Sequence, residues 1–149
     1  MLLLTHTITG AVIGEKISNP IIISLIALAS HFILDSLPHS DLKVPTKFDT
    51  WKFLRILPDI IPAILIYITF IFTYPDQWLT IHLGITCAIL PDFLSLSKYM
   101  PKFQKIMAPL NNWHKKIQWQ LDSNFKEKIL GLLTQIIYIT ILIIILKFI

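Results

Sequence analysis

The sequence has little cysteine and little charge. Its one cysteine, Cys87, lies inside an apolar run, so a disulfide within the monomer and a CxxC metal or redox site are both excluded. Charged residues make up 15% of the chain, against about 25% in an average soluble domain, and 54% of the residues are hydrophobic. A soluble fold of this size needs more polar groups to cover its surface. The composition therefore predicts a single domain embedded in a membrane.

Two other absences narrow the function. The N-terminal stretch has no basic region and contains His6 and Glu15, so we expect no removable signal peptide. The net charge of +4 is modest, and the lysines alternate with apolar segments instead of gathering on one polar face. We interpret them as topology signals and expect no nucleic-acid partner.

Four segments have the apolar length of a membrane-spanning helix, about 20 residues. They cover residues 20–37, 57–74, 78–97 and 129–146. Asn19 followed by Pro20 is typical of a helix start. Residues 2–13 are too short to span and predict a tilted or half-inserted helix, in which Gly10 and Gly14 form a small-residue face for close packing. The predicted fold class is an all-α, multi-pass transmembrane bundle.

The hydrophilic stretches 39–55 and 98–128 are separated by two predicted spans and therefore lie on the same side. They contain every basic residue except Lys16 and Lys147. The positive-inside rule places both stretches in the cytoplasm. In the second stretch Trp113, Ile117, Leu121 and Phe125 are at helical spacing, which predicts an amphipathic helix on the membrane surface. A soluble cap packed on the other helices explains the pattern equally well.

Most histidines and several aspartates fall at one predicted depth. A helix rises about 1.5 Å per residue, so depth can be estimated from the distance to the end of each predicted span. The residues expected in the cytoplasmic leaflet are His6, His31, Asp35, His39, Asp41, Asp59, Asp92 and His114. His82 belongs to the outer half, and we interpret it as a packing residue. Ionisable groups inside membrane helices are costly, about 2.5–3.5 kcal/mol for a mid-helix Asp, so they persist where they pair, line water or bind an ion.

The segment 30–41, SHFILDSLPHSD, is the densest concentration of metal-ligand types. His31 and Asp35 are four residues apart and project from one helix face. Imidazole together with carboxylate suits a divalent metal, Zn²⁺ first, with Mn²⁺ or Fe²⁺ as alternatives. His6 and Asp92 are the best candidates to complete the ligand set from other helices. An ion pair between helices is the alternative interpretation of His31 and Asp35.

Three further residues each have two interpretations. His114 is a metal ligand or a surface residue. Asp41 is a general base or a turn residue, and Asp59 is a general base or, as we favour, a first-turn acid stabilised by the helix dipole. With an open coordination position the metal would activate water to attack an ester or phosphoester at the cytoplasmic lipid–water boundary. A non-catalytic membrane protein, whose cluster binds metal or fixes helix packing, is the main alternative, and a transporter ranks third.

Three motifs together resemble a known family. LTHTITGAVIG, SHFILDSLPHSD and LPDFLSL, within residues 3–97, resemble the bacterial membrane-bound metal-dependent hydrolases of the inner membrane, described as LexA-binding. Their order is also distantly similar to zinc-dependent phospholipase C and S1/P1-type nucleases. The resemblance implies metal-binding roles for His6, His31, Asp35, His39 and Asp92. The HRG-x-THS-like segment common in the family does not occur here, and LexA binding is not carried over.

Overall fold

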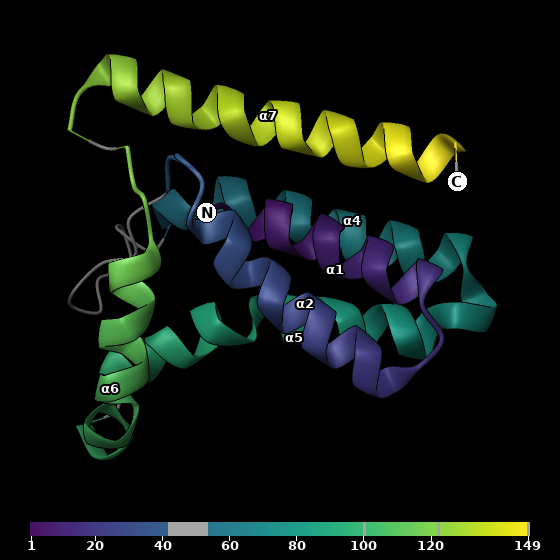
Figure 1. Ribbon diagram of the computed structural model, residues 1–149, viewed down its shortest axis with the longest axis horizontal. Helices are drawn as coiled ribbons and strands as arrows, with labels where there is room; N and C mark the ends of the chain where they lie inside the picture. Colours follow the sequence, from purple (N-terminus) through teal and green to yellow (C-terminus); the bar gives the residue numbers. More distant parts are fainter. Residues whose placement is uncertain (42–53, 100, 122, 149) are drawn as a thin grey trace.

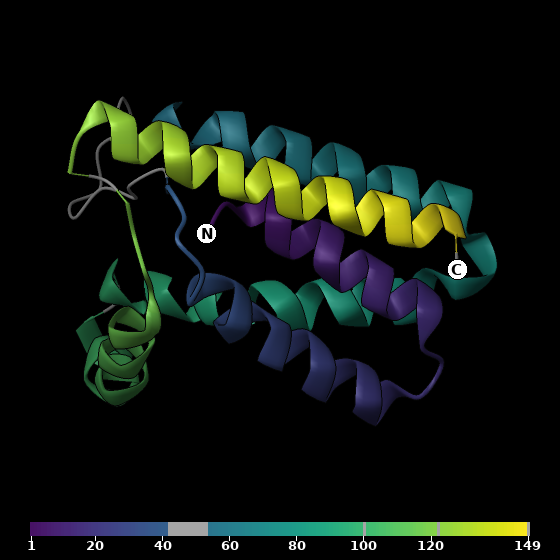
Figure 2. The ribbon, with the colours of Figure 1, turned by 45° about the horizontal axis from the view of Figure 1, so that its top comes forward.

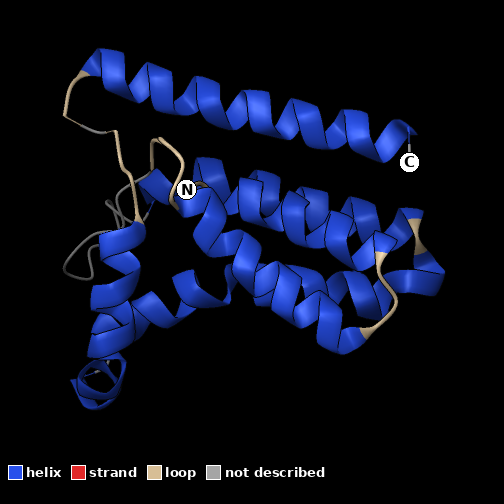
Figure 3. Ribbon diagram, in the orientation of Figure 1, coloured by secondary structure: helices blue, strands red, loops and turns tan. Residues whose placement is uncertain are grey.

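The computed structural model describes residues 1–41, 54–99, 101–121 and 123–148 (Figure 1). Its α-helices are α1 (Leu3–Lys16), α2 (Pro20–Asp35), α4 (Leu57–Thr73), α5 (Trp78–Ser95), α6 (Pro101–Ile117) and α7 (Phe125–Phe148). Short 3-10 helices cover Leu54–Ile56, Pro75–Gln77 and Leu96–Tyr99. All regular elements in the described ranges are helical (Figure 3), which confirms the predicted all-α class. Lys43, Lys47 and Lys52, which entered the topology prediction, lie outside these ranges.

The helix α1 is the centre of the bundle. It contacts α5, α4, α2 and α7, and it is enclosed by them in Figure 2. A Cβ added at Gly10 would lie 2.6 Å from the carbonyl oxygen of Gly84, and one at Gly14 would collide with the backbone of Thr80 and Ile81. The predicted small-residue face is therefore confirmed. The helix α1 is buried among the other helices along most of its length, and its predicted tilted or half-inserted position in the membrane stays a prediction.

The bundle has a polar interior and an apolar exterior. Buried polar side chains include Thr5, His6, Thr9, His31, Asp35 and Gln135, whereas large apolar side chains point outward from α2, α4, α5 and α7. Phe72 on α4 is 81% exposed and Ile21 on α2 is 70% exposed. Water disfavours contiguous apolar exteriors, whereas a hydrocarbon solvent favours them. This arrangement supports membrane association.

Two helices in the described ranges are long and apolar enough to cross a membrane, Pro75–Ser95 and Phe125–Ile144. The other two predicted spans form apolar helices, α2 with 16 residues and α4 with 17. At 1.5 Å per residue these helices are about 24–26 Å long, shorter than a hydrocarbon core of about 30 Å. The Asn19 side chain caps α2 by accepting hydrogen bonds from the amides of Ile21 and Ile22, as predicted.

The helix α6 crosses one end of the bundle (Figure 1). It ends at Ile117, so the prediction that Leu121 and Phe125 continue one amphipathic helix was wrong. The chain leaves the helix because it pairs with the segment after α2. The amide of Trp119 donates to Asp35 O at 2.9 Å, and the amide of Leu121 donates to His39 O at 2.7 Å. This pairing fixes the end of α6 against the end of α2.

Candidate metal centre

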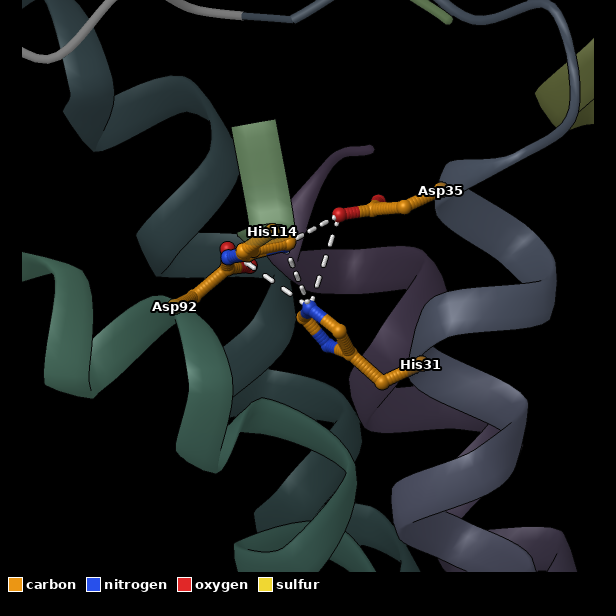
Figure 4. Close-up of side chains that lie close together, drawn as sticks. All are labelled: His31, Asp35, Asp92 and His114. Carbon is orange, nitrogen blue, oxygen red and sulfur yellow. Dashed lines mark hydrogen bonds and ion pairs between the residues drawn. The ribbon is translucent and has the colours of Figure 1, made fainter. Parts of the chain in front are cut away.

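Side chains from three helices meet at the end of the bundle that α6 crosses (Figure 4). His31 and Asp35 come from α2, Asp92 from α5 and His114 from α6. One potential ligand atom from each of the four lies within 4.8 Å of all the others. The sequence named all four residues, and the structure brings them together. Two imidazoles and two carboxylates could hold a metal ion.

The distances in this group suit nitrogen and oxygen ligands of one metal. Nε2 of His114 lies 2.7 Å from Oδ2 of Asp35 and 3.0 Å from Nε2 of His31. Nε2 of His31 lies 3.4 Å from Oδ2 of Asp35 and 3.9 Å from Oδ1 of Asp92. Tetrahedral ligands at about 2.0–2.2 Å from a metal are about 3.3–3.6 Å apart. The measured separations lie around this range, so the four side chains could bind one metal ion.

The ring of His31 is oriented by a backbone group of α5. Its Nδ1 lies 2.7 Å from the carbonyl oxygen of Ala88. A carbonyl oxygen can only accept, so the proton is on Nδ1, and in the neutral imidazole the Nε2 lone pair points into the group. Metal-binding histidines almost always donate their other ring N–H to such a partner. This hydrogen bond orients His31 in the way that a metal ligand requires.

Asp35 is the anionic centre of the group. Its side chain is fully buried. The Met1 ammonium donates to Oδ1 at 2.6 Å, and the Gln118 amide donates to Oδ2 at 3.1 Å. A buried carboxylate is costly unless it is paired and hydrogen-bonded. These partners allow Asp35 to remain ionised, which is the form that binds metals.

His6 on α1 faces the same carboxylates from the other side. Its ring stacks on that of His31, with centroids 4.2 Å apart. Nε2 of His6 lies 3.3 Å from Oδ1 of Asp35 and 4.0 Å from Oδ2 of Asp92, whereas His31 faces the other oxygen of each carboxylate. The imidazole is fully buried, and within the described part of the chain neither ring nitrogen has a hydrogen-bond partner. Buried nitrogens without such partners are costly, and a cation beside the carboxylates would satisfy one of them.

Asp59 is engaged in a different task. Its Oδ2 accepts a hydrogen bond from the amide of Leu3 at 2.8 Å, and its Oδ1 accepts one from the amide of Leu4 at 3.0 Å. The residue before α1 is Leu2, whose side chain cannot cap a helix. Asp59 therefore supplies, from the first turn of α4, the cap that α1 lacks. This contact favours the structural interpretation of Asp59, while its assignment as a general base stays a prediction, since Asp59 also lines the cavity described below.

Two further histidines lie outside the group. His39 is buried on the segment that pairs with Gln120, and its Nδ1 donates to Leu37 O at 2.8 Å. The structure does not bring it into the set of four, although the sequence included it among the ligands. His82 hydrogen-bonds through Nδ1 to the Tyr67 hydroxyl at 3.0 Å, which agrees with its predicted packing role.

Asp41 lies just beyond α2, beside the group. Its Oδ2 is 3.8 Å from the Met1 ammonium, and its side chain is 24% exposed. Burial, together with the negative charges of Asp92 and Asp35, raises the pKa of the Asp41 carboxyl to about 7 despite the nearby Met1 ammonium. A carboxyl that titrates near neutral pH is suited to act as a general base.

Sequence reasoning missed two glutamines. Gln118 holds Asp35, and it lies four residues after His114, so the helical spacing pointed to it. Gln135 is buried in the middle of α7, where its amide donates to Ser40 O at 2.7 Å and its oxygen accepts from Leu2 N at 2.9 Å. A polar residue inside an apolar span was the signal that went unused. Gln135 ties α7 to the end of the bundle that contains the group.

The group opens on a cavity of about 750 Å³. Polar lining comes from Asp41, Asp92, His114 and Lys115, and apolar lining comes from Ile60, Ile89, Phe93 and Leu96. Ligand sites commonly have volumes of about 300–1,000 Å³ and combine apolar walls with a few polar groups. The cavity thus has apolar walls, and one lysine and two members of the His/Asp group also line it.

Comparison of the chain with models of protein families, with curated proteins and with solved structures gives no match. The resemblance to the membrane-bound hydrolases therefore stays a prediction. The interpretation of the site depends on its own geometry.

Proposed function

We propose that this chain is a metal-dependent hydrolase of the inner membrane that cleaves an ester or phosphoester of a lipid-like substrate. The observation that supports this most is the oriented His/Asp group at the mouth of an amphipathic cavity. The metal would be bound by the four residues His31, Asp35, Asp92 and His114. His6 would face the second oxygen of each carboxylate, Oδ1 of Asp35 and Oδ2 of Asp92. The donor set of imidazole and carboxylate favours Zn²⁺, with Mn²⁺ or Fe²⁺ as alternatives.

The proposed topology has four spans, α2, α4, α5 and α7. Two of them reach full spanning length, and the shorter α2 and α4 would be accommodated by local thinning of the bilayer. By the positive-inside rule, the two lysine-containing stretches support a cytoplasmic position for the end with the His/Asp group. The cavity would then open at the lipid–water boundary, where a lipid head group is presented.

The reaction would divide the work among few residues. A bound metal ion acts as a Lewis acid and makes its bound water more acidic. Asp41, with a pKa near 7, lines the cavity and would accept the proton of the attacking water. Lys115 would attract an anionic substrate. The apolar walls formed by Ile89 and Phe93 would receive its hydrocarbon part and exclude water.

A non-catalytic role is the second candidate, in which the same group fixes helix packing. The observation that favours it is the direct contact of 2.7 Å between Nε2 of His114 and Oδ2 of Asp35. Such a hydrogen bond joins α6 to α2 without any metal. In that case the protein would be equally stable with and without added zinc.

Elemental analysis of the detergent-purified chain tests the proposal. We expect bound zinc in the wild type and its loss in His31→Ala and Asp35→Asn. His82→Ala is the matched control, because that imidazole lies outside the group. Hydrolysis of fluorogenic phosphomonoester, phosphodiester and carboxylester lipids is then measured with the same variants. Metal retained at full stoichiometry in His31→Ala would contradict the assignment. Bound metal without hydrolysis of any of these lipids would favour the non-catalytic role.

A further inference from the structure

The helix α6 is oriented differently from the bundle. The helices α2, α4, α5 and α7 run along the long axis of the molecule, whereas α6 lies across their ends (Figures 1 and 2). If the long helices cross the bilayer, α6 lies in the plane of one membrane interface. Amphipathic helices in that orientation bury an apolar face at the boundary between head groups and acyl chains.

One face of α6 is apolar and largely exposed. Phe103, Ile106, Leu110 and Trp113 follow one another at steps of three or four residues, so they form one stripe. Ile106 is 69% exposed and Phe103 is 55% exposed. The neighbouring face contains the buried His114, which is turned toward the bundle. The helix therefore has one side turned toward the protein and an adjacent apolar side that the described part of the chain leaves largely exposed.

The charge of α6 identifies the partner. The helix contains Lys102, Lys105, Lys115 and Lys116, all exposed, and its sequence contains no aspartate or glutamate. An apolar stripe beside lysines, with no acidic residue on the helix, is complementary to an anionic phospholipid surface, which attracts basic residues near its head groups.

The same helix supplies one member of the metal group. His114 follows Trp113 directly, and the Trp113 ring packs on Phe32 of α2 with centroids 4.8 Å apart. His31, Asp35 and Asp92 belong to the long helices, so the set includes His114 only when α6 lies against their ends. We infer that an anionic bilayer surface holds α6 in place and thereby sets the affinity of the centre for metal. This inference rests on the proposed metal centre.

The test uses the full chain in lipid nanodiscs. The discs contain either phosphatidylcholine alone or three parts of phosphatidylcholine to one of phosphatidylglycerol, and the probe is Zn²⁺ in competition with a chromophoric chelator. We expect Zn²⁺ affinity to be at least about fivefold higher in the anionic discs. This factor corresponds to the attraction of about one lysine to an anionic membrane surface. Lys102→Gln/Lys105→Gln should abolish the difference. The matched control, Lys126→Gln/Lys128→Gln, removes the same charge from the start of α7 and should preserve it.

A second readout is independent of metal. In a Trp51→Phe/Trp78→Phe/Trp119→Phe variant, which retains Trp113, lipids brominated near the head group should quench Trp113 more strongly in anionic discs. Quenching together with equal Zn²⁺ affinity in both discs overturns the inference and leaves the metal centre intact. Quenching without Zn²⁺ binding in either disc overturns the proposed function and the inference with it. An unquenched Trp113 with self-associated chains would show that a second copy covers this face, which also overturns the inference.

Discussion

Nε2 of His114 lies 2.7 Å from Oδ2 of Asp35, although 79 positions separate the two residues in the chain. The contact joins the helix across the end of the bundle to a helix inside it. It also places the fourth member of the His/Asp group. Five predictions follow from this arrangement and from the contacts around it.

The first concerns His114 itself. His114→Ala should lower the affinity for Zn²⁺ by at least about tenfold, the smaller loss seen when even an outer partner of a metal ligand is removed. Competition titration against a chelator measures this. Asn112→Ala, on the exposed side of the same helix, is the control. Equal affinity in both variants would remove His114 from the ligand set.

Gln118 is a positioning residue in this scheme, since its amide orients Oδ2 of Asp35. Gln118→Ala should weaken Zn²⁺ binding by about tenfold while the stoichiometry stays the same. Gln104→Ala, on an exposed part of α6, should have no effect. Loss of the metal altogether would show that Gln118 does more than orient the carboxylate.

The close crossing of α1 and α5 should be sensitive to a single methyl group. Gly10→Ala would place Cβ 2.6 Å from the carbonyl oxygen of Gly84, so the helices must separate. We expect a loss of about 1–3 kcal/mol in the free energy of unfolding. Unfolding in mild detergent measures it. Ala29→Leu adds more volume at an exposed position of α2 and should be neutral.

Asp59 provides a test that separates capping from catalysis. Asp59→Ala removes the acceptor of two α1 amides and should lower the free energy of unfolding by about 0.5–2 kcal/mol. Any lipid hydrolysis should persist at temperatures where the variant stays folded. Abolished hydrolysis in a folded Asp59→Ala protein would restore this residue to the catalytic set.

The pH dependence of stability should report on Asp41. Its pKa is raised from an ordinary value of 3.8 to about 7 in the folded chain. The folded state therefore binds more protons than the unfolded state between these values, and stability falls as the pH rises from about 4 to about 7. Thermal unfolding with chelator present measures this slope. Asp41→Asn should flatten it, and an unchanged slope would show that other groups cause it.

Within α2 the candidate site could be predicted because its geometry is local. His31 and Asp35 share a face whenever residues 20–35 form a helix, and the apolar pattern with the Asn19 cap ensures that they do. The apolar lengths of the segments, together with the scarcity of charge, also gave the all-α class. These features depend on periodicity and on solvent, and both can be read along the chain.

The other assignments depended on contacts between distant segments. The same residue types allowed His114 to be a ligand or a surface residue, and Asp59 to be a base or a cap. Which interpretation applies depends on where the C-terminal end of α6 and the N-terminal end of α1 lie relative to the other helices. Pairing of the 118–121 segment with residues 35–39 ended α6 early and turned His114 inward. The amphipathic spacing of Trp113 and Phe125 had suggested one continuous helix instead.

The sequence alone determined that this protein is helical, apolar on the outside, and equipped with imidazole and carboxylate groups at one level of its helices. Only the tertiary structure decided which of those groups meet. The reason is physical: helix formation and burial in lipid respond to local spacing, whereas a metal centre requires side chains from α2, α5 and α6 to converge within 4.8 Å. That convergence is set by the glycine-mediated crossing of α1 with α5 and by the backbone pairing after α6.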